Sequence, residues 1–473
     1  MISATEYDSH DAMGLAQLVA DGGATASELT EMAISRIEEL NPTLNAVITT
    51  DFDRARESAA IDLAAGRLHG VPWLVKDLGT NVEGLPATNG SRSLADNIAP
   101  ADSELIRRHR AAGLNLLGKT NTPEMGMNVC TAPALFGPTP NPHDPTRSAG
   151  GSSGGSACAV AAGILPAAHA TDSGGSIRIP ASNCGLFGLK PTRARVPLGN
   201  DLPEGLGGLS TGHAVTHSVR DSALLLDLTA GPMPGDAYAA PTAPVAGFLA
   251  AIGGPLSPLK VAVWTEGFDD EPISQECRSA ALTAAALCES LGCRVVEERP
   301  PVDGAGLRRT LDVLFSANIA ANIRLIRGGT DDAASETLFE PVTLAAAAYA
   351  SRLGAVDYVG AIAAAQAAAR ALGRFFEEYD VLLTPTLANP PLPLGELSTD
   401  THDWPAYLSR MLDEIPFTPL FNVTGGPAAS VPLGLSADGL PIGVQFGAAL
   451  GSETILLQLA AALEIAAPWH QRT

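Results

Sequence analysis

Short apolar runs and helix-like apolar periodicities alternate along this chain, and turn residues separate them. The apolar runs are as long as buried strands, and the longer periodic stretches are as long as helices. Strands are expected at 46–49, 71–75, 114–117, 259–264, 294–298 and 381–384. Helices are expected as a pair within 9–40, at 155–164, near 275–291, over most of 300–380, and at 453–466.

Capping residues locate two helix boundaries. Thr25 and Glu28 form a T-x-x-E capping box for the second N-terminal helix, and Asn41-Pro42 is expected to end that helix. Asp102 is expected to cap the helix SELIRRHRAAG, which closes at Gly113.

A hairpin is expected near the C-terminus, because the runs 429–435 and 442–446 flank the turn Ser436-Ala437-Asp438-Gly439. Strands and helices alternate through much of the chain. The pattern predicts an α/β protein with a mixed, helix-covered sheet.

Length and composition agree with a globular protein and add an estimate of its size. The chain has 473 residues, of which 46% are hydrophobic and 17% charged, as in globular proteins. A chain of this length exceeds what one hydrophobic core usually holds, so it predicts several domains or one large layered domain with insertions.

The formal net charge of −22 argues against nucleic acid and anionic membrane surfaces as partners. The N-terminal MISATEYDSHDAM lacks the features of a signal peptide, and no apolar run approaches the length of a membrane span. Six cysteines without a C-x-x-C pair indicate free buried thiols, so a cytoplasmic location is expected. We expect neither a metal nor a cofactor, since no metal-ligand cluster appears.

One formal motif is rejected. Residues 113–120 read GLNLLGKT, which matches a phosphate-binding loop, but the first glycine ends a helix and the intervening residues are apolar. We therefore interpret this segment as a strand and discard ATP binding.

A second motif keeps an alternative open. GGSSGG at 150–155 contains G-x-S-x-G twice, although a Pro-rich loop precedes it instead of an apolar strand. The alternative enzyme is an α/β-hydrolase-like esterase with a histidine triad. Its histidine would be one of His169, His213, His217, His402 and His470.

Two Gly-Gly-Ser turns carry the main chemical hypothesis. Residues 147–155 read RSAGGSSGG and residues 171–180 read TDSGGSIRIP. Glycine-rich turns can aim several backbone N–H groups into one concavity, as an oxyanion hole requires. Apolar residues flank both turns, which is not typical of a flexible linker.

A serine nucleophile needs a base, and Lys76 ends the apolar run GVPWLVK. Desolvation there would lower the lysine pKa and let its neutral amine accept a proton. A surface lysine is the alternative for this residue taken alone.

The motifs GVPWLVKD, AGGSSGGS, TDSGGSIRIPAS and CGLFGLKPT together resemble the amidase-signature family, and further matches cover most of the chain. The resemblance implies a single domain over 1–473 with a large mixed twisted sheet and helices on both faces. Within it, 60–230 would be the catalytic core segment and 232–380 a variable, mostly helical segment that shapes the substrate pocket.

The resemblance also implies roles for particular residues. Ser176 would be the nucleophile, Ser152 a bridging serine held by a cis peptide, and Lys76 the base. The other implied positions are Ser173, Gly174, Gly175 and Ser176 for the oxyanion hole, Ser153, Asp172 and Arg178 for support, and Gly126 and Met127 for the pocket. Asp172 and Arg178 are interpreted as braces of their loop, and core packing is an equal alternative for Met127.

The expected function is hydrolysis of a carbon–nitrogen bond, other than a peptide bond, in a small-molecule amide. The resemblance is closest to bacterial amidases that act on linear or cyclic amides, and anilides, esters and carbamates stay open as substrates. A homodimer is a further possibility. The non-enzymatic alternative, a catalytically silent scaffold on the same fold, is disfavoured because all three triad positions are filled.

Overall fold

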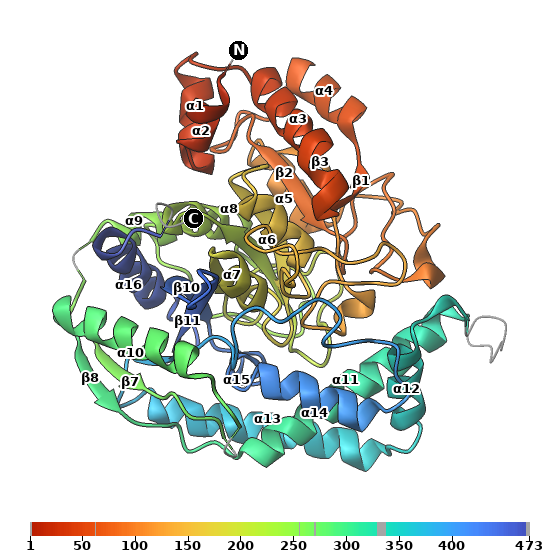
Figure 1. Cartoon of the computed structure of the whole chain (residues 1–473), viewed down its shortest axis with the longest axis vertical. Coiled ribbons are helices and arrows are strands. Elements are labelled where there is room, and N and C mark those ends of the chain that lie inside the picture. Colours follow the sequence, from red (N-terminus) through yellow and green to blue (C-terminus); the bar gives the residue numbers. More distant parts are fainter. Residues whose placement is uncertain (1, 62, 255, 269–270, 329–336, 470–473) are drawn as a thin grey trace.

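The structure is a computed structural model that describes residues 2–61, 63–254, 256–268, 271–328 and 337–469. Two sheets organise it (Figure 1). The strands are β1 (Val47–Thr50), β2 (Pro72–Lys76), β3 (Asn115–Thr120), β4 (Ala167–Asp172), β5 (Phe187–Lys190), β6 (Thr211–Thr216), β7 (Lys260–Val263), β8 (Arg294–Glu297), β9 (Val381–Pro385), β10 (Ala428–Leu435) and β11 (Pro441–Ala448).

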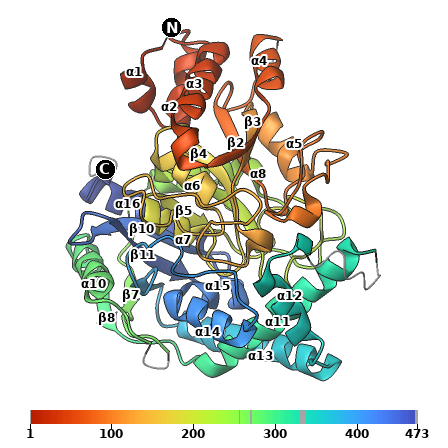
Figure 2. The same cartoon turned by 45° about the vertical axis from the view of Figure 1, so that its right-hand side comes forward.

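The helices lie around and between these sheets (Figures 1 and 2). They are α1 (Ala4–Asp8), α2 (Ala12–Ala20), α3 (Ala26–Leu44), α4 (Phe52–Ile61), α5 (Glu104–Ala111), α6 (Gly154–Ala161), α7 (Arg178–Cys184), α8 (Val219–Thr229), α9 (Phe248–Ile252), α10 (Gln275–Ser290), α11 (Gly304–Ile326), α12 (Pro341–Ala350), α13 (Ala355–Phe375), α14 (Trp404–Glu414), α15 (Thr418–Thr424) and α16 (Glu453–Ala466). None of these helices combines the length and apolar character that a membrane span needs.

The larger sheet has eight strands in the order β4-β6-β5-β10-β11-β9-β7-β8. Pairing is antiparallel from β4 through to β9 and parallel for β9-β7 and β7-β8. This mixed, eight-stranded sheet confirms the predicted α/β class.

Helices cover both faces of this sheet, and two glycines of the β10-β11 hairpin show it. Successive strand residues point to opposite faces. Gly443 on β11 lies against Ser182 of α7, whereas Gly434, which pairs with Ile442, lies against Ala280 of α10. Because residues 442 and 443 face opposite ways, α7 and α10 pack on opposite faces.

The smaller sheet, β1-β3-β2, carries the predicted lysine. Strand β2 runs parallel to β3, with Lys76 paired to Thr120 at its carboxyl end. All five residues of β2 are buried, and β2 also packs against β4 of the larger sheet. The end of β2 is thereby brought to the carboxyl end of β4, where the TDSGGS segment begins.

The strands and helices expected from periodicity all appear, with ends shifted by a few residues. The capping box of Thr25 and Glu28 is confirmed. The segment GLNLLGKT lies mostly in β3, which confirms its interpretation as a strand.

Two boundary predictions were wrong. The helix α3 continues past Pro42 to Leu44, because a proline in the last turn removes only one late N–H, and the Asn41 side chain bonds the amides of the departing chain. Asp102 does not cap α5. Its carboxylate accepts from Glu83 N and Arg110 Nε, while the first amide of the helix donates to Asp201.

Candidate active site

Lys76 is fully buried at the end of β2. We measure 2.7 Å from its Nζ to Ser152 Oγ and 2.9 Å to Thr171 Oγ1, with Thr171 O at 3.4 Å. The strand end and the two glycine-rich loops therefore meet at one amine. Thr171 directly precedes the TDSGGS turn's aspartate, but sequence reasoning did not single it out.

Burial lowers the pKa of Lys76 well below its ordinary value, and the charge of Asp172 opposes this only in part. The adjacent Asp77 is engaged elsewhere. Its carboxylate lies 2.5 Å from the buried Lys119 Nζ and accepts from Thr88. Although Asp77 follows Lys76 in the sequence, the structure pairs it with Lys119, and Asp172 is the carboxylate whose charge acts on Lys76.

Ser152 is buried and follows a cis peptide bond from Gly151, in agreement with the family resemblance. The neighbouring Ser153 links the two loops: its Oγ donates to Thr171 O and accepts from Thr171 N. A Cβ placed on Gly126 would lie 3.3 Å from Ser152 Oγ. The predicted pocket residue Gly126 therefore faces this serine.

The turn after β4 is organised by the carboxylate of Asp172. It accepts from Gly175 N at 2.8 Å and from Ile177 N at 3.1 Å, on either side of Ser176. Gly175 has φ +131°, and a Cβ there would lie 2.5 Å from Thr418 Oγ1, so only glycine fits.

Of the four predicted oxyanion-hole amides, that of Gly175 differs from the others because it already has an acceptor. Gly175 N donates to Asp172 and is engaged within the turn. The amides of Ser173, Gly174 and Ser176 donate to no backbone or side-chain acceptor among the described residues. Ser173, Gly174 and Ser176 are also partly exposed. These three residues are the ones with N–H groups free for a ligand.

Arg178 braces the turn, as predicted. Its guanidinium makes two contacts of 2.9–3.0 Å with Asp172, and both side chains are fully buried. It also donates to Asn422 Oδ1, Gln445 Oε1 and Thr418 O. Burial alone would raise the pKa of Asp172, but Arg178 and its hydrogen-bond donors bring it to about 2. Asp172 is thus held ionised.

The two serine-bearing loops touch through their main chains, since Ser153 N donates to Ser176 O at 3.3 Å. No hydrogen bond between the hydroxyls of Ser152 and Ser176 is among the described contacts. The structure therefore joins Lys76 to Ser152 directly and places Ser176 beside them.

The segment opposite Ser152 is held by residues that sequence reasoning missed. Glu124, buried two residues before Gly126, accepts from Ser91, from Thr343 of α12 and from the Glu340 amide. Tyr407 of α14 donates to Met127 O at 2.8 Å. The helical segment beyond residue 300 thus anchors the loop that faces Ser152. Met127 itself is buried in the main hydrophobic core.

The open side of the turn is bordered by two further residues. Ser173 Oγ lies 2.7 Å from Ser210 Oγ. Phe315 of α11 reaches the turn, because a Cβ on Gly174 would lie 3.5 Å from its ring. Only proximity in the fold identifies these residues, which lie 37 and 142 positions from Ser173.

Two of the candidate histidines bond groups other than Lys76 and the two serines. His213 Nε2 bonds Ser222 Oγ, and His217 Nε2 bonds the Val160 carbonyl, while His470 lies outside the described residues. Cys130 and Cys158 are buried free thiols, and burial raises their pKa values to about 11 and about 12. Within the described part of the chain, no three His, Cys, Asp or Glu side chains are grouped as metal ligands would be.

This fold and this arrangement of loops are those of an amidase: the family model for amidases matches residues 28–457, and the chain belongs to that family. Such enzymes are hydrolases of carbon–nitrogen bonds other than peptide bonds, and the predicted class is confirmed.

Particular relatives cover nearly the whole chain. A 6-aminohexanoate-cyclic-dimer hydrolase of Paenarthrobacter ureafaciens is 40% identical over 488 residues, which is 98% of this chain and 96% of the relative. An acylamidase of Rhodococcus erythropolis is 35% identical over 483 residues, covering 99% and 98%.

Solved structures agree with this assignment. The structure of a 6-aminohexanoate cyclic dimer hydrolase complexed with substrate superimposes with a TM-score of 0.92 at 37% identity, covering 98% of both chains. A bacterial aryl acylamidase of the amidase-signature family gives a TM-score of 0.88 at 28% identity, covering 98% of this chain and 97% of the other.

Proposed function

We propose that the protein hydrolyses small-molecule amides through an acyl-enzyme on Ser176, with Ser152 as proton relay and Lys76 as base. The observation that carries this proposal is the 2.7 Å contact between the buried Lys76 Nζ and Ser152 Oγ. A lysine with a lowered pKa can be a neutral amine, which donates two hydrogen bonds to Thr171 and accepts one from the Ser152 hydroxyl.

In the first step, Ser152 gives its proton to Lys76 and takes the hydroxyl proton of Ser176. Ser176 Oγ then forms a bond to the amide carbon, and the carbonyl π electrons move to the oxygen. The contact between Ser153 and Ser176 supports this relay, because it places the two serine loops side by side. Rotation of the Ser152 and Ser176 side chains then brings their hydroxyls together for the proton transfer.

The oxyanion formed in this step is bound by backbone N–H groups. We assign this role to Ser173, Gly174 and Ser176, whose amides are free, and we leave out Gly175, whose amide is engaged by Asp172. The Asp172–Arg178 pair keeps the turn in one conformation before the substrate arrives, so little reorganisation is needed.

In the second step, Ser152 returns a proton to the substrate nitrogen, the carbon–nitrogen bond breaks and the amine leaves. Water then attacks the ester carbon and gives one proton to the relay. The bond to Ser176 Oγ breaks, Ser176 regains its proton, and a carboxylic acid is released.

We propose linear and cyclic aliphatic amides as the substrate class. The relatives of this chain include a 6-aminohexanoate-cyclic-dimer hydrolase and an acylamidase, which supports this choice. Phe315 of α11, whose ring lies beside Gly174, supports an apolar substrate wall. Gly126 leaves space beside Ser152 for the scissile amide. The cytoplasmic location and the homodimer stay predictions, and light scattering would measure the oligomeric state.

The experiment is a panel of 6-aminohexanoate cyclic dimer, a linear aliphatic amide, an anilide, an ester and a carbamate, with the released amine or alcohol measured directly. We expect hydrolysis of the aliphatic amides and covalent labelling of Ser176 by a fluorophosphonate. A folded protein that neither hydrolyses an amide nor is labelled would support the silent scaffold.

A further inference from the structure

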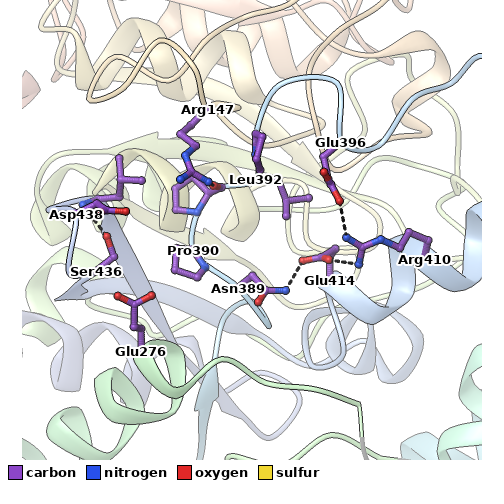
Figure 3. A pocket seen from close by; sticks show the side chains of 13 residues that line it. Arg147, Glu276, Asn389, Pro390, Leu392, Glu396, Arg410, Glu414, Ser436 and Asp438 are labelled. Carbon is purple, nitrogen blue, oxygen red and sulfur yellow. Dashed lines mark hydrogen bonds and ion pairs between the residues drawn. The ribbon is translucent and has the colours of Figure 1, made fainter.

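A cavity of about 440 Å³ lies beside Arg147, five residues before Ser152 (Figure 3). The loop 146–148 forms part of its wall by pairing with the Pro-rich segment 389–394: Ser148 N donates to Leu392 O, and Leu394 N donates to Thr146 O. The ends of α10 and α14 and the β10-β11 turn complete it. None of the proposed catalytic residues lines this cavity.

Carboxylates outnumber cations around the cavity, with four against two. The lining carboxylates are Glu276, Glu396, Glu414 and Asp438, and the lining cations are Arg147 and Arg410. Arg410 is already shared between Glu414 and Glu396 (Figure 3). Arg147 Nε lies 3.8 Å from Asp144, outside this set. The cavity therefore has a surplus of negative charge, which favours a cationic occupant.

A narrow inner cavity of about 10 Å³ continues the larger one, and the two share Asn389, Pro390, Leu392 and Glu414. This volume is that of a single water-sized group. Its other walls are mostly apolar, from Val129, Cys130, Ile179 and Leu387. The inner cavity can hold one small polar group but nothing larger.

One residue that lines this inner cavity carries an unpaired acceptor. Asn183 is 4% exposed, and its Oδ1 has no hydrogen-bond partner among the described residues. Buried polar atoms are almost always paired, so an unpaired one indicates a site for a donor. Glu414, also buried, presents a second acceptor here, although Asn389 Nδ2 and Arg410 already donate to it. Two acceptors in a space for one group favour a ligand group with several N–H donors.

We propose that these joined cavities bind a primary alkylammonium ion, separately from the triad. The ammonium lies in the inner cavity and donates to Asn183 Oδ1 and Glu414. The aliphatic chain lies in the outer cavity along Pro390, Leu392 and Leu440, while Glu276 and Asp438 contribute negative potential at the rim. An amine of this class is the kind of product that amide hydrolysis releases, and in this respect the inference rests on the proposed function.

Isothermal titration calorimetry with n-butylammonium chloride tests the proposal, and n-butanol and butyltrimethylammonium chloride serve as comparison probes. We expect saturable binding of n-butylammonium only, because the alcohol lacks charge and the quaternary ion lacks N–H donors. Glu414→Gln and Asn183→Leu should each weaken binding at least about tenfold, as loss of a charge-assisted or buried hydrogen bond does. Glu396→Gln is the matched control, since it removes the other carboxylate on Arg410 but leaves the inner cavity intact.

A crystal soaked with n-butylammonium gives a second measurement that does not depend on how the variants fold. We expect its nitrogen between Asn183 and Glu414. The proposal is overturned if the amine binds only beside Ser176, if the quaternary ion binds equally well, or if Glu396→Gln weakens binding as much as Glu414→Gln. Absence of binding to the folded wild-type protein would overturn it too.

Discussion

Lys76 Nζ lies 2.7 Å from Ser152 Oγ at a point where both side chains are sealed from solvent. Lys76 comes from the small sheet and Ser152 from a loop that packs on the large one, so the contact depends on how β2 and β4 meet. Because the pKa of Lys76 is lowered by this burial, the contact joins a serine to an amine that can be neutral in the folded protein.

The acid limb of kcat/KM should report the protonation of Lys76. As pH falls below its pKa, Nζ gains a proton and loses the lone pair that accepts from Ser152, so activity falls. Because burial lowers the pKa of Lys76, this limb should lie below the ~10.4 of an ordinary lysine, in the direction of neutral pH. Lys76→Ala should lower activity by several orders of magnitude and remove the limb from what remains, and Lys76→Arg should not restore it. An unchanged acid limb in Lys76→Ala would exclude this lysine as the base.

Ser176→Ala should abolish both turnover and fluorophosphonate labelling, because the acyl-enzyme bond can no longer form. Ser152→Ala should lower kcat by several orders of magnitude, as members of one relay do. Ser290→Ala is the control, since that hydroxyl bonds only a carbonyl of its own helix on the surface. If the Ser176→Ala protein is still labelled and active, the nucleophile must be another residue.

Asp172→Asn should destabilise the fold and lower kcat together. It leaves Arg178 as a buried cation without its anion, a change that typically costs about 3–5 kcal/mol of unfolding free energy. Asp8→Asn, which breaks the surface pair with Arg36, should cost less than about 1 kcal/mol. Urea unfolding measures both. Equal costs for the two variants would contradict the role of Asp172 as an organiser of the turn.

Gly126→Ala should lower kcat/KM at least about tenfold, because its Cβ would lie 2.7 Å from Leu78 and 3.3 Å from Ser152 Oγ. Gly395→Ala is matched for backbone strain, with φ +87° against +72°, but its Cβ would meet nothing within 4 Å. Each variant should lose about 1–2 kcal/mol from the left-handed conformation. Comparable activity losses in the two would show that strain alone is responsible.

Replacement of His213 by Gln should leave kcat within about tenfold of the wild type, because its ring bonds Ser222 of α8 and takes no part in the proposed proton transfers. Amine release and thermal unfolding should be measured on the same preparation. A loss as large as that in Ser176→Ala, without loss of the fold, would revive the histidine-triad alternative.

Periodicity predicted strands where an apolar run is closed by turn residues, as at 259–264 and 381–384, because such a run can be stable only when buried. It did not predict β4, β5 and β6, which lie in the Gly- and Ser-rich part of the chain. There, strand formation depends on pairing with partners up to 242 positions away, as for Gly188 with Ser430.

The sequence by itself determined the family and the α/β class, because local motifs in their order along the chain are enough to recognise them, and the same motifs predicted the roles of the lysine and the two serines. Only the tertiary structure decided which charges act on them. In the folded protein Asp77 pairs with Lys119, and the charge of Asp172 acts on Lys76. The Gly175 amide donates to Asp172, whereas the other three amides of the turn named above are free. It also brought Asn422, Phe315 and Tyr407 to the site from distant elements. The physical reason is that hydrogen bonding and desolvation act over a few ångströms in space, and sequence separation does not report that distance.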